Sequence, residues 1–188
     1  MNLKLKWILK LASPIKYLLI VYLFFAIGHQ LTNISGIIIP VKQINKEFTI
    51  EKNLEYLGAP KSKVDDLTQA VKIASDSTNL KEELIVAIIK TESNFKNHAV
   101  SYKKYKGLMQ TPTATFIYSD VDVLHGARIL KDKLRITNGN LLQALTLYKG
   151  GNNSIARRYA IETLDLYKDL LEKNQRRKTW MKMKIPKY

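Results

Sequence analysis

Between residues 64 and 92 the apolar residues recur with the spacing of an α-helix, and this limits the folds that the chain can adopt. One helical face is formed by residues at i, i+3, i+4 and i+7, namely Leu67, Ala70, Val71 and Ala74. A second apolar stripe consists of Leu84, Ile85, Ile88 and Ile89. No stretch of the sequence alternates strictly between apolar and polar residues, as a half-buried strand does. We therefore predict an all-α, mainly helical fold.

Caps and turn residues predict where the helices begin and end. Asn79 followed by Glu82 has the form of a capping box, which predicts the start of the helix that carries the second stripe. Asn138 and Gly139 predict the end of another helix. Further helices are expected at about residues 108–117, 121–137, 140–149 and 153–172.

The N-terminal segment, residues 1–40, is typical of a membrane-directed helix. Four lysines within the first 16 residues precede a run without charge from Tyr17 to Val41, and about 20 apolar residues suffice to cross a bilayer. Two interpretations stay open: an uncleaved signal anchor, or a signal peptide cut near Ala26-Ile27-Gly28. In both cases the lysines stay in the cytoplasm, so the rest of the chain is expected in the cell envelope, outside the cytoplasmic membrane, or secreted.

The remainder divides into three parts. Residues 41–65 are polar and punctuated by Gly58 and Pro60, which predicts a stalk or linker. Residues 66–172 form the predicted globular helical domain. Residues 173–188 form a basic tail, either solvated or in contact with anionic lipid or wall polymers.

Charge and composition limit the ligands and cofactors that the chain is expected to bind. The chain has 188 residues, with 31 Lys and Arg against 16 Asp and Glu, a net charge of +15 that attracts polyanions. There is no cysteine, and three histidines lie far apart in the sequence. Because catalytic zinc sites need about three converging ligands, we expect neither a metal nor another cofactor.

Glu92 is the candidate catalytic residue. It lies four residues after Ile88, so a continuing helix places its carboxyl group on the apolar face near the C-terminal end. Burial and the negative end of the helix dipole both raise the pKa of a carboxyl group. A carboxyl group that stays protonated near neutral pH can act as the general acid in glycosidic-bond cleavage. The alternative is a structural glutamate, either paired with a lysine or capped by backbone amides.

Five short segments occur in a fixed order: residues 92–101 with Glu92-Ser93, residues 107–115 with Gly107-Leu108-Met109-Gln110, residues 120–130, residues 145–151, and residues 157–164 with Tyr159. This order resembles the lytic transglycosylase (SLT) family of the lysozyme-like superfamily, over about residues 66–171. The resemblance implies a lysozyme-like fold with peptidoglycan as the substrate.

The resemblance also implies site residues. Glu92 corresponds to the family's catalytic acid and base. The implied substrate-binding residues are Ser93, Ser101, Gly107, Leu108, Met109, Gln110, Tyr148 and Tyr159. The sequence departs from the family at Lys104-Tyr105, at Asp122-Val123 and at Lys149, where the family has an asparagine. An amide both donates and accepts hydrogen bonds, whereas lysine only donates, so Asn152 or Asn153 would have to replace that contact.

The implied reaction cleaves the bond between N-acetylmuramic acid and N-acetylglucosamine and leaves a 1,6-anhydro product. Asp120, Asp122 and Glu162 are the candidates for a second carboxylate near Glu92. Three alternatives stay open: a goose-type muramidase that uses water, an inactive wall-binding module, and a membrane-tethered basic protein that binds lipid or nucleic acid. Expected partners are glycan strands, the membrane, and secretion or conjugation machinery.

Overall fold

The computed structural model describes residues 41–112, 114 and 118–184, and the side chains within residues 46–181. The predicted signal anchor or signal peptide, residues 1–40, lies outside the described residues. The described chain is helical, and its only β-type pairing consists of isolated bridges. The prediction of an all-α fold is confirmed for this part of the chain.

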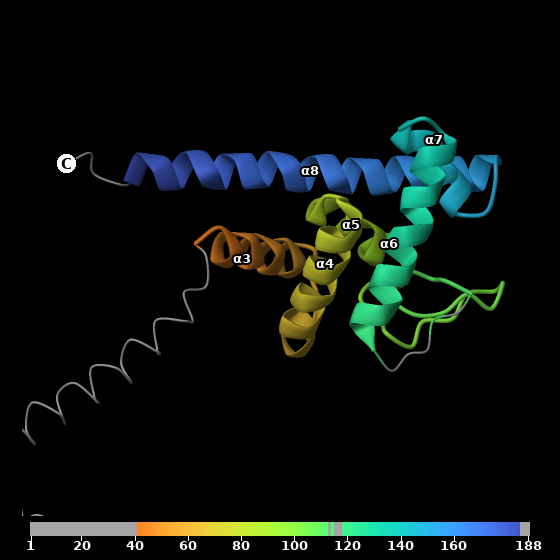
Figure 1. Ribbon diagram of the computed structural model, residues 1–188, viewed down its shortest axis with the longest axis horizontal. Coiled ribbons are helices and arrows are strands. Elements are labelled where there is room, and N and C mark those ends of the chain that lie inside the picture. The colour runs from red at the N-terminus through yellow and green to blue at the C-terminus, as the bar shows by residue number, and fades with distance from the viewer. Residues whose placement is uncertain (1–40, 113, 115–117, 185–188) are drawn as a thin grey trace, which may run out of the picture. The chain divides into compact units, whose positions relative to one another are not determined.

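Six α-helices and one 3-10 turn follow one another along the described chain (Figure 1). In order they are α3 (Val41–Tyr56), η1 (Lys61–Lys63), α4 (Val64–Thr78), α5 (Glu82–Ser93), α6 (Ser119–Ile136), α7 (Leu141–Tyr148) and α8 (Ser154–Lys184). The two predicted apolar stripes lie on α4 and α5. Their members are buried: Leu67, Ala70, Val71, Ala74, Leu84, Ile85, Ile88 and Ile89.

The core lies where α4 packs on α6, and where α8 packs on α5 and α7. Val123, Ala127 and Leu130 give α6 its buried face, and Leu145 does the same for α7. Their spacing along α6 is that of an amphipathic helix. This packing brings the C-terminal ends of α5 and α7 close to the first turns of α8; Figure 1 shows the order of these helices.

Residues 41–56 differ from the prediction, because they form a packed helix and not a stalk. Ile50, Asn53 and Leu54 of α3 are fully buried. Lys46 contacts Asp76 of α4 at 2.6 Å. Only a few apolar residues of α3 are buried, so its sequence shows little helical periodicity. For this reason the sequence predicted a polar linker.

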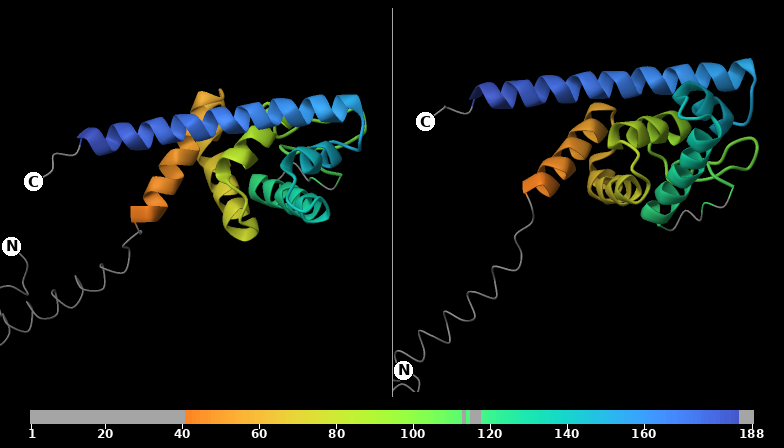
Figure 2. Two further views of the ribbon diagram at one scale, coloured as in Figure 1. Left: turned by 90° about the horizontal axis from the view of Figure 1, so that it is seen from above. Right: turned by 45° about the horizontal axis from the view of Figure 1, so that its top comes forward.

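The helix α8 continues well past residue 172, so the predicted boundary between domain and tail is wrong. Asn174 donates a hydrogen bond to the buried carboxylate of Glu83 at 2.8 Å, and Arg177 donates to Asn53 at 3.3 Å. These contacts hold α8 against α5 and α3 (Figure 2). Residues 173–184 were assigned to a tail because they are mostly basic and polar, although some of them pack against the domain.

Two local predictions are also wrong. No helix forms at residues 108–112, where Lys106 and Thr111 instead exchange backbone hydrogen bonds across a turn. Asn79 is not the cap of α5. It ends α4 with φ of 59°, a left-handed conformation that asparagine tolerates better than most residues.

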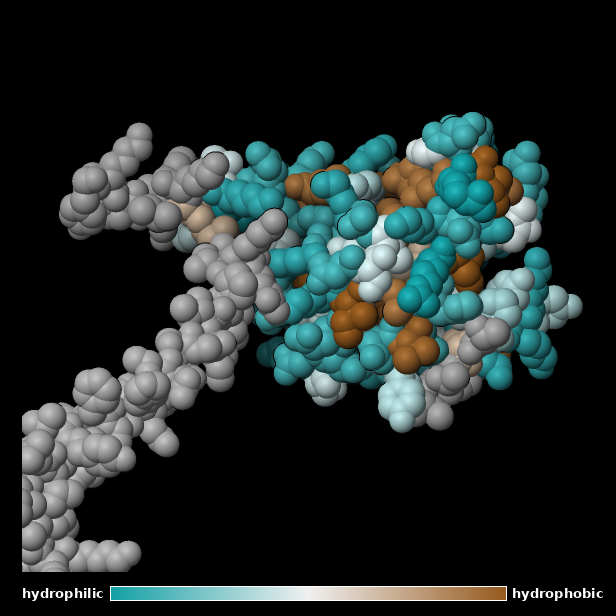
Figure 3. Space-filling view, in the orientation of Figure 1, coloured by the Kyte–Doolittle hydropathy of each residue, from teal (hydrophilic) through white to brown (hydrophobic). Residues whose placement is uncertain are grey.

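Among the described residues, no helix combines the length and the apolar character needed to span a bilayer. The face seen in Figure 3 is largely hydrophilic, and its hydrophobic areas are small and separate.

Candidate active site

Glu92 lies in the last turn of α5 with its side chain only 3 % exposed. Ile85 and Ile88, on the same face of the helix, are fully buried. Asn94 ends the helix in the left-handed conformation, with φ of 49°, so the chain turns away directly after the Glu92-Ser93 pair. The predicted burial of Glu92 on the apolar face is confirmed.

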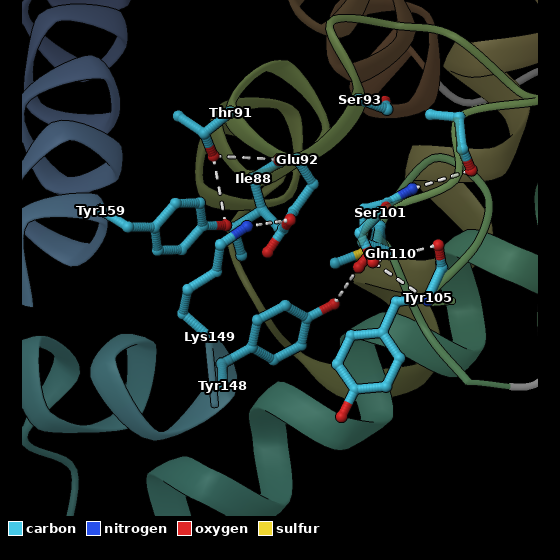
Figure 4. A network of polar contacts seen from close by, with 12 residues as sticks. Ile88, Thr91, Glu92, Ser93, Ser101, Tyr105, Gln110, Tyr148, Lys149 and Tyr159 are labelled. Atoms are coloured by element: carbon cyan, nitrogen blue, oxygen red, sulfur yellow. Dashed lines mark hydrogen bonds and ion pairs between the residues drawn. The ribbon is translucent and has the colours of Figure 1, made fainter. Parts of the chain in front are cut away.

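The carboxylate of Glu92 forms an ion pair with Lys149, the residue that departs from the family pattern. The ammonium nitrogen of Lys149 lies 2.5 Å from Oε2 of Glu92 (Figure 4). The same nitrogen lies 4.3 Å from the centre of the Tyr159 ring, within the range of a cation–π contact. The Lys149 side chain is 34 % exposed, so one side of the cation remains open to solvent.

Opposing effects act on the proton of Glu92. Burial raises the pKa of its carboxyl group above the ordinary value, while the charge and hydrogen bond of Lys149 and a hydrogen bond from Tyr159 lower it. Burial outweighs them, so the pKa of Glu92 is raised. The C-terminal end of α5 acts in the same direction as burial, because its unpaired carbonyl groups repel a carboxylate.

Tyr159 is held by two threonines. Its hydroxyl oxygen lies 3.2 Å from that of Thr91, which in turn lies 3.1 Å from that of Thr163. Burial and the charge of Glu92 raise the pKa of Tyr159 well above its usual range, so this phenol stays protonated. It can therefore serve only as a neutral hydrogen-bond partner beside the acid.

The segment Gly107–Gln110 forms the predicted turn. Gly107 has φ of 77°, and a β-carbon there would lie 2.8 Å from a carboxylate oxygen of Asp122 and 2.9 Å from the side chain of Ala114. Only glycine satisfies both conditions. The side-chain amide of Gln110 donates to the carbonyl oxygens of Ala99 and Gly107, each at 2.9 Å, which locks the turn to the preceding loop.

Tyr148 joins this turn to α7. Its hydroxyl donates a hydrogen bond to the carbonyl oxygen of Met109 at 2.7 Å. Gly126 of α6 makes room for both residues, since a β-carbon there would lie 2.6 Å from Cβ of Met109 and 3.0 Å from the Tyr148 hydroxyl. Burial and the nearby charge of Glu92 raise the pKa of Tyr148 well above its usual range.

These groups surround a cavity of about 280 Å³, which we call the Glu92 pocket. Its walls come from the C-terminal end of α5, the loop before the Gly107 turn, the end of α7 and the start of α8. The lining residues are Glu92, Ser101, Tyr102, Lys103, Tyr105, Gln110, Tyr148, Lys149, Asn153, Ile155 and Ala156. Glu92 is the only carboxylate among these described residues.

Five of the predicted site residues meet here: Glu92, Ser101, Gln110 and Tyr148 line the pocket, and Tyr159 contacts Lys149. The others do not reach it. The hydroxyl of Ser93 donates to the carbonyl oxygen of Ile89 within its own helix, and in Figure 4 it lies apart from the ion pair. Gly107, Leu108 and Met109 belong to the turn but do not line the pocket. The side chains of Leu108 and Met109 are buried in the hydrophobic core.

None of the acids weighed as a second carboxylate lines the pocket. Asp122 is buried beside Gly107, and Glu162 is exposed on α8. Asp120 lies in the first turn of α6. The structure therefore places a single carboxyl group in the described pocket.

Sequence reasoning missed several pocket residues. Tyr102 and Lys103 belong to none of the matched motifs, and Ile155 lies in a predicted helix but in no motif. Thr91, which contacts Tyr159 beside the pocket, was not predicted because its partners lie on α8, more than 60 residues away. Asn153, a predicted substitute for the family amide, lines the pocket. Lys149 departs from the family pattern, but its pairing with Glu92 was not predicted.

Comparison with known families agrees with the geometry. A sequence model of the transglycosylase SLT domain matches residues 69–121. The matched segment includes Glu92, Ser101 and the Gly107 turn, whereas Tyr148, Lys149 and Tyr159 lie beyond it. No solved structure was found to match the chain significantly. Residues 69–121 are therefore similar to a transglycosylase SLT domain, in agreement with the family resemblance that the sequence motifs predicted.

Proposed function

We propose that this protein is a peptidoglycan lytic transglycosylase that uses Glu92 first as an acid and then as a base. The observation that carries the proposal is the single buried carboxyl group with a raised pKa in the Glu92 pocket, without a second described carboxylate in its lining. Glycosidases that employ water or a covalent intermediate ordinarily use two carboxyl groups about 5 to 9.5 Å apart. A reaction that uses neither water nor a covalent intermediate can proceed with a single glutamate.

In the first step, protonated Glu92 donates its proton to the oxygen that bridges N-acetylmuramic acid and N-acetylglucosamine. The bond between that oxygen and C1 of the muramic residue breaks, and positive charge develops at C1. The raised pKa of Glu92 supports this role, because a proton is available at the pH where an ordinary glutamate has lost it.

In the second step, the Glu92 carboxylate accepts the proton of the C6 hydroxyl of the same muramic residue. The C6 oxygen then bonds to C1 and closes the 1,6-anhydro ring. Glu92 is protonated again, and no water is consumed. The nucleophile belongs to the bound sugar, so the attack is effectively unimolecular.

Lys149 and Tyr159 stabilise Glu92 between the two steps. While Glu92 carries a negative charge, the ammonium group at 2.5 Å and the hydrogen bond from Tyr159 lower its free energy. The same contacts keep the carboxylate oxygens oriented toward the pocket. Lys149 therefore takes over the task of orienting the acid, although it cannot accept a hydrogen bond as an asparagine does.

The test is digestion of purified sacculi, with the products analysed by mass spectrometry. The wild type is expected to release anhydro-muropeptides, and Glu92→Gln to lower the rate by about 100- to 10 000-fold, the usual contribution of a general acid. Glu162→Gln, an exposed carboxylate-to-amide change on α8, is the matched control and should retain the rate. Products that are heavier by one water molecule would show a muramidase. Retained activity in Glu92→Gln would overturn the assignment.

We also propose that the domain acts outside the cytoplasmic membrane. Support comes from the sequence of residues 1–41, in which lysines precede the uncharged run, and from the substrate, which lies on that side of the membrane. Protease added to intact spheroplasts should digest the helical domain of the membrane-associated protein. A domain that stays protected until the cells are lysed would contradict this location.

A further inference from the structure

The Glu92 pocket holds an excess of positive charge. Its described lining contains one carboxylate, Glu92, and two lysines, Lys103 and Lys149. Lys149 is paired with Glu92, whereas Lys103 forms no ion pair with a described carboxylate. The ammonium nitrogen of Lys103 lies beside the backbone of Gly150, where an added β-carbon would approach it to 3.5 Å. The loop before the Gly107 turn thus brings Lys103 next to the residue that follows Lys149.

The net positive charge of the pocket is larger when Glu92 is protonated, which is the state that starts the proposed reaction. When Glu92 is protonated, Lys149 loses its counter-charge, and two ammonium groups then face one cavity without an anion among its described lining residues. Like charges in a partly dry site repel one another more strongly than in water. The state of the pocket that can donate a proton is therefore complementary to a negatively charged group on the ligand.

We propose that Lys103 and Lys149 form a subsite for a carboxylate of the glycan, and that this carboxylate replaces Glu92 as the partner of Lys149 when substrate binds. The inference rests on the proposed function for the identity of the substrate. It adds a specificity that a neutral sugar pocket lacks, because a saccharide with a free carboxylate beside the scissile bond is preferred.

The geometry around Lys149 permits the exchange. Its side chain is partly exposed, whereas the Glu92 side chain is almost completely buried, so an anion in the pocket reaches Lys149 from the open side. The Tyr159 ring, 4.3 Å from the ammonium nitrogen, holds the cation in place whichever carboxylate it contacts. Lys149 moves its hydrogen bond from one partner to another without leaving the pocket.

The exchange couples substrate binding to protonation. The charge and hydrogen bond of Lys149 lower the pKa of Glu92, against the effect of burial. A substrate carboxylate that takes over Lys149 weakens this opposition, so the pKa of Glu92 rises further and the acid binds a proton as the substrate arrives. Lys149 is in this sense a positioning residue for Glu92.

Two sources supply such a carboxylate: the lactyl group of a muramic residue without a peptide, and the peptide stem. Three soluble probes separate them. N-acetylmuramic acid has the lactyl carboxylate, its methyl ester has no charge, and N-acetylmuramoyl-L-alanyl-D-isoglutamine has a carboxylate on the peptide alone. Binding of each to the purified full chain is measured by isothermal titration calorimetry.

We expect wild-type protein to bind N-acetylmuramic acid at least about tenfold more tightly than the methyl ester, a difference of about 1.4 kcal/mol. The dipeptide probe should bind like the ester if the subsite accepts the lactyl carboxylate alone, and like the acid if the subsite also accepts a carboxylate of the stem. Lys103→Gln and Lys149→Gln should each reduce the preference for a carboxylate. Lys131→Gln, an exposed lysine of α6 outside the pocket lining, is the control and should keep it. Circular dichroism verifies that each variant is folded.

The exchange itself has a separate readout. Calorimetry in two buffers of different ionisation enthalpy should show proton uptake when N-acetylmuramic acid binds near neutral pH, and no uptake in Glu92→Gln. Equal affinity for acid and ester, or a preference that survives both lysine substitutions, would overturn the subsite. Binding without proton uptake would overturn the exchange of partners.

These measurements do not need turnover, so the two proposals fail separately. A protein that digests sacculi but binds acid and ester alike keeps its proposed function and loses the subsite. A protein that prefers the carboxylate but releases no anhydro-muropeptide keeps the subsite and loses the proposed function.

Discussion

The hydroxyl of Tyr148 donates a hydrogen bond to the carbonyl oxygen of Met109, at 2.7 Å, and this bond ties the end of α7 to the Gly107–Gln110 turn. One wall of the Glu92 pocket therefore depends on a contact between segments 39 residues apart. Tyr148 supplies the wall with its ring and fixes the turn with its hydroxyl. The first prediction separates these two contributions.

Tyr148→Phe keeps the ring and removes the hydroxyl. The free energy of unfolding should fall by about 0.5–1.5 kcal/mol, because the hydrogen bond to the carbonyl group of Met109 is lost. The rate of wall digestion should fall as well, since the turn is less firmly placed. Thermal unfolding and a sacculus digest measure the two effects. The control is Tyr118→Phe, at an exposed tyrosine outside the pocket lining, and equal effects of the two substitutions would contradict the prediction.

Gly126→Ala tests the close approach of α6 to the turn. In an open helix this change stabilises by roughly 1 kcal/mol. Here the added β-carbon would lie 2.6 Å from Cβ of Met109, so we expect instead a loss of about 1–3 kcal/mol from overpacking, together with a slower reaction.

Gly139→Ala provides the comparison for Gly126→Ala. Gly139 has φ of 81° and no neighbour within 4 Å of an added β-carbon, so this change costs backbone strain alone and should spare activity. Thermal melts and digestion rates of both variants are compared. An increase in stability for Gly126→Ala would show that α6 and the turn are not in close contact.

Glu92→Gln should alter how stability depends on pH. Since the pKa of Glu92 is raised, the folded protein holds this proton more tightly than the unfolded chain does. Stability of the wild type therefore falls as the pH rises from the pKa of an unfolded glutamate, about 4.3, through the higher folded value. The groups that face this carboxyl are Lys149, Tyr159 and Tyr148, and both phenols have raised pKa values and stay neutral in this range.

The variant lacks this decline. As the pH rises above the pKa of an unfolded glutamate, about 4.3, the melting temperature of the variant should therefore increase relative to that of the wild type. Scanning calorimetry at several pH values measures the difference, with Glu162→Gln as the exposed control. Parallel curves for wild type and Glu92→Gln would mean that burial does not raise the pKa of this carboxyl group.

Asn174→Ala tests whether the basic end of the chain belongs to the folded domain. Asn174 is buried and donates to Glu83 at 2.8 Å, so its removal leaves a buried carboxylate without this donor. We expect a loss of about 1–3 kcal/mol in urea unfolding. Gln175→Ala, the exposed neighbour on the same helix, should change stability by less than about 0.5 kcal/mol. Similar small effects at both positions would restore the interpretation of a solvated tail.

The parts of the fold that could be predicted are those in which local pattern and packing agree. The stripes on α4 and α5 have the helical period, and the burial of Glu92 follows from its register on α5. The helix α3 could not be predicted in this way. Ile50 and Leu54 are its fully buried apolar residues, the intervening Asn53 is polar, and Asn53 accepts a hydrogen bond from Arg177, more than 120 residues away in the sequence.

The same distinction holds for the pocket. Glu92 and Gln110 belong to compact motifs, so their chemistry could be inferred from a few neighbouring residues. Lys149 lies 57 residues from Glu92, and neither residue has a local feature that reveals the other. A motif comparison indicated only that a lysine stands where an amide is usual. Which anion it pairs with is decided by the way in which α5 and α7 end against α8.

The helix α8 runs without a break from Ser154 to Lys184. Near its start Tyr159 stands beside the acid, and near its other end Arg177 contacts α3, the first helix after residues 1–40. At a rise of 1.5 Å per residue, these two side chains are attached about 27 Å apart along the helix axis. An unbroken helix of this length fixes the separation between the Glu92 pocket at one end of the domain and the contact of Arg177 with Asn53 of α3 at the other.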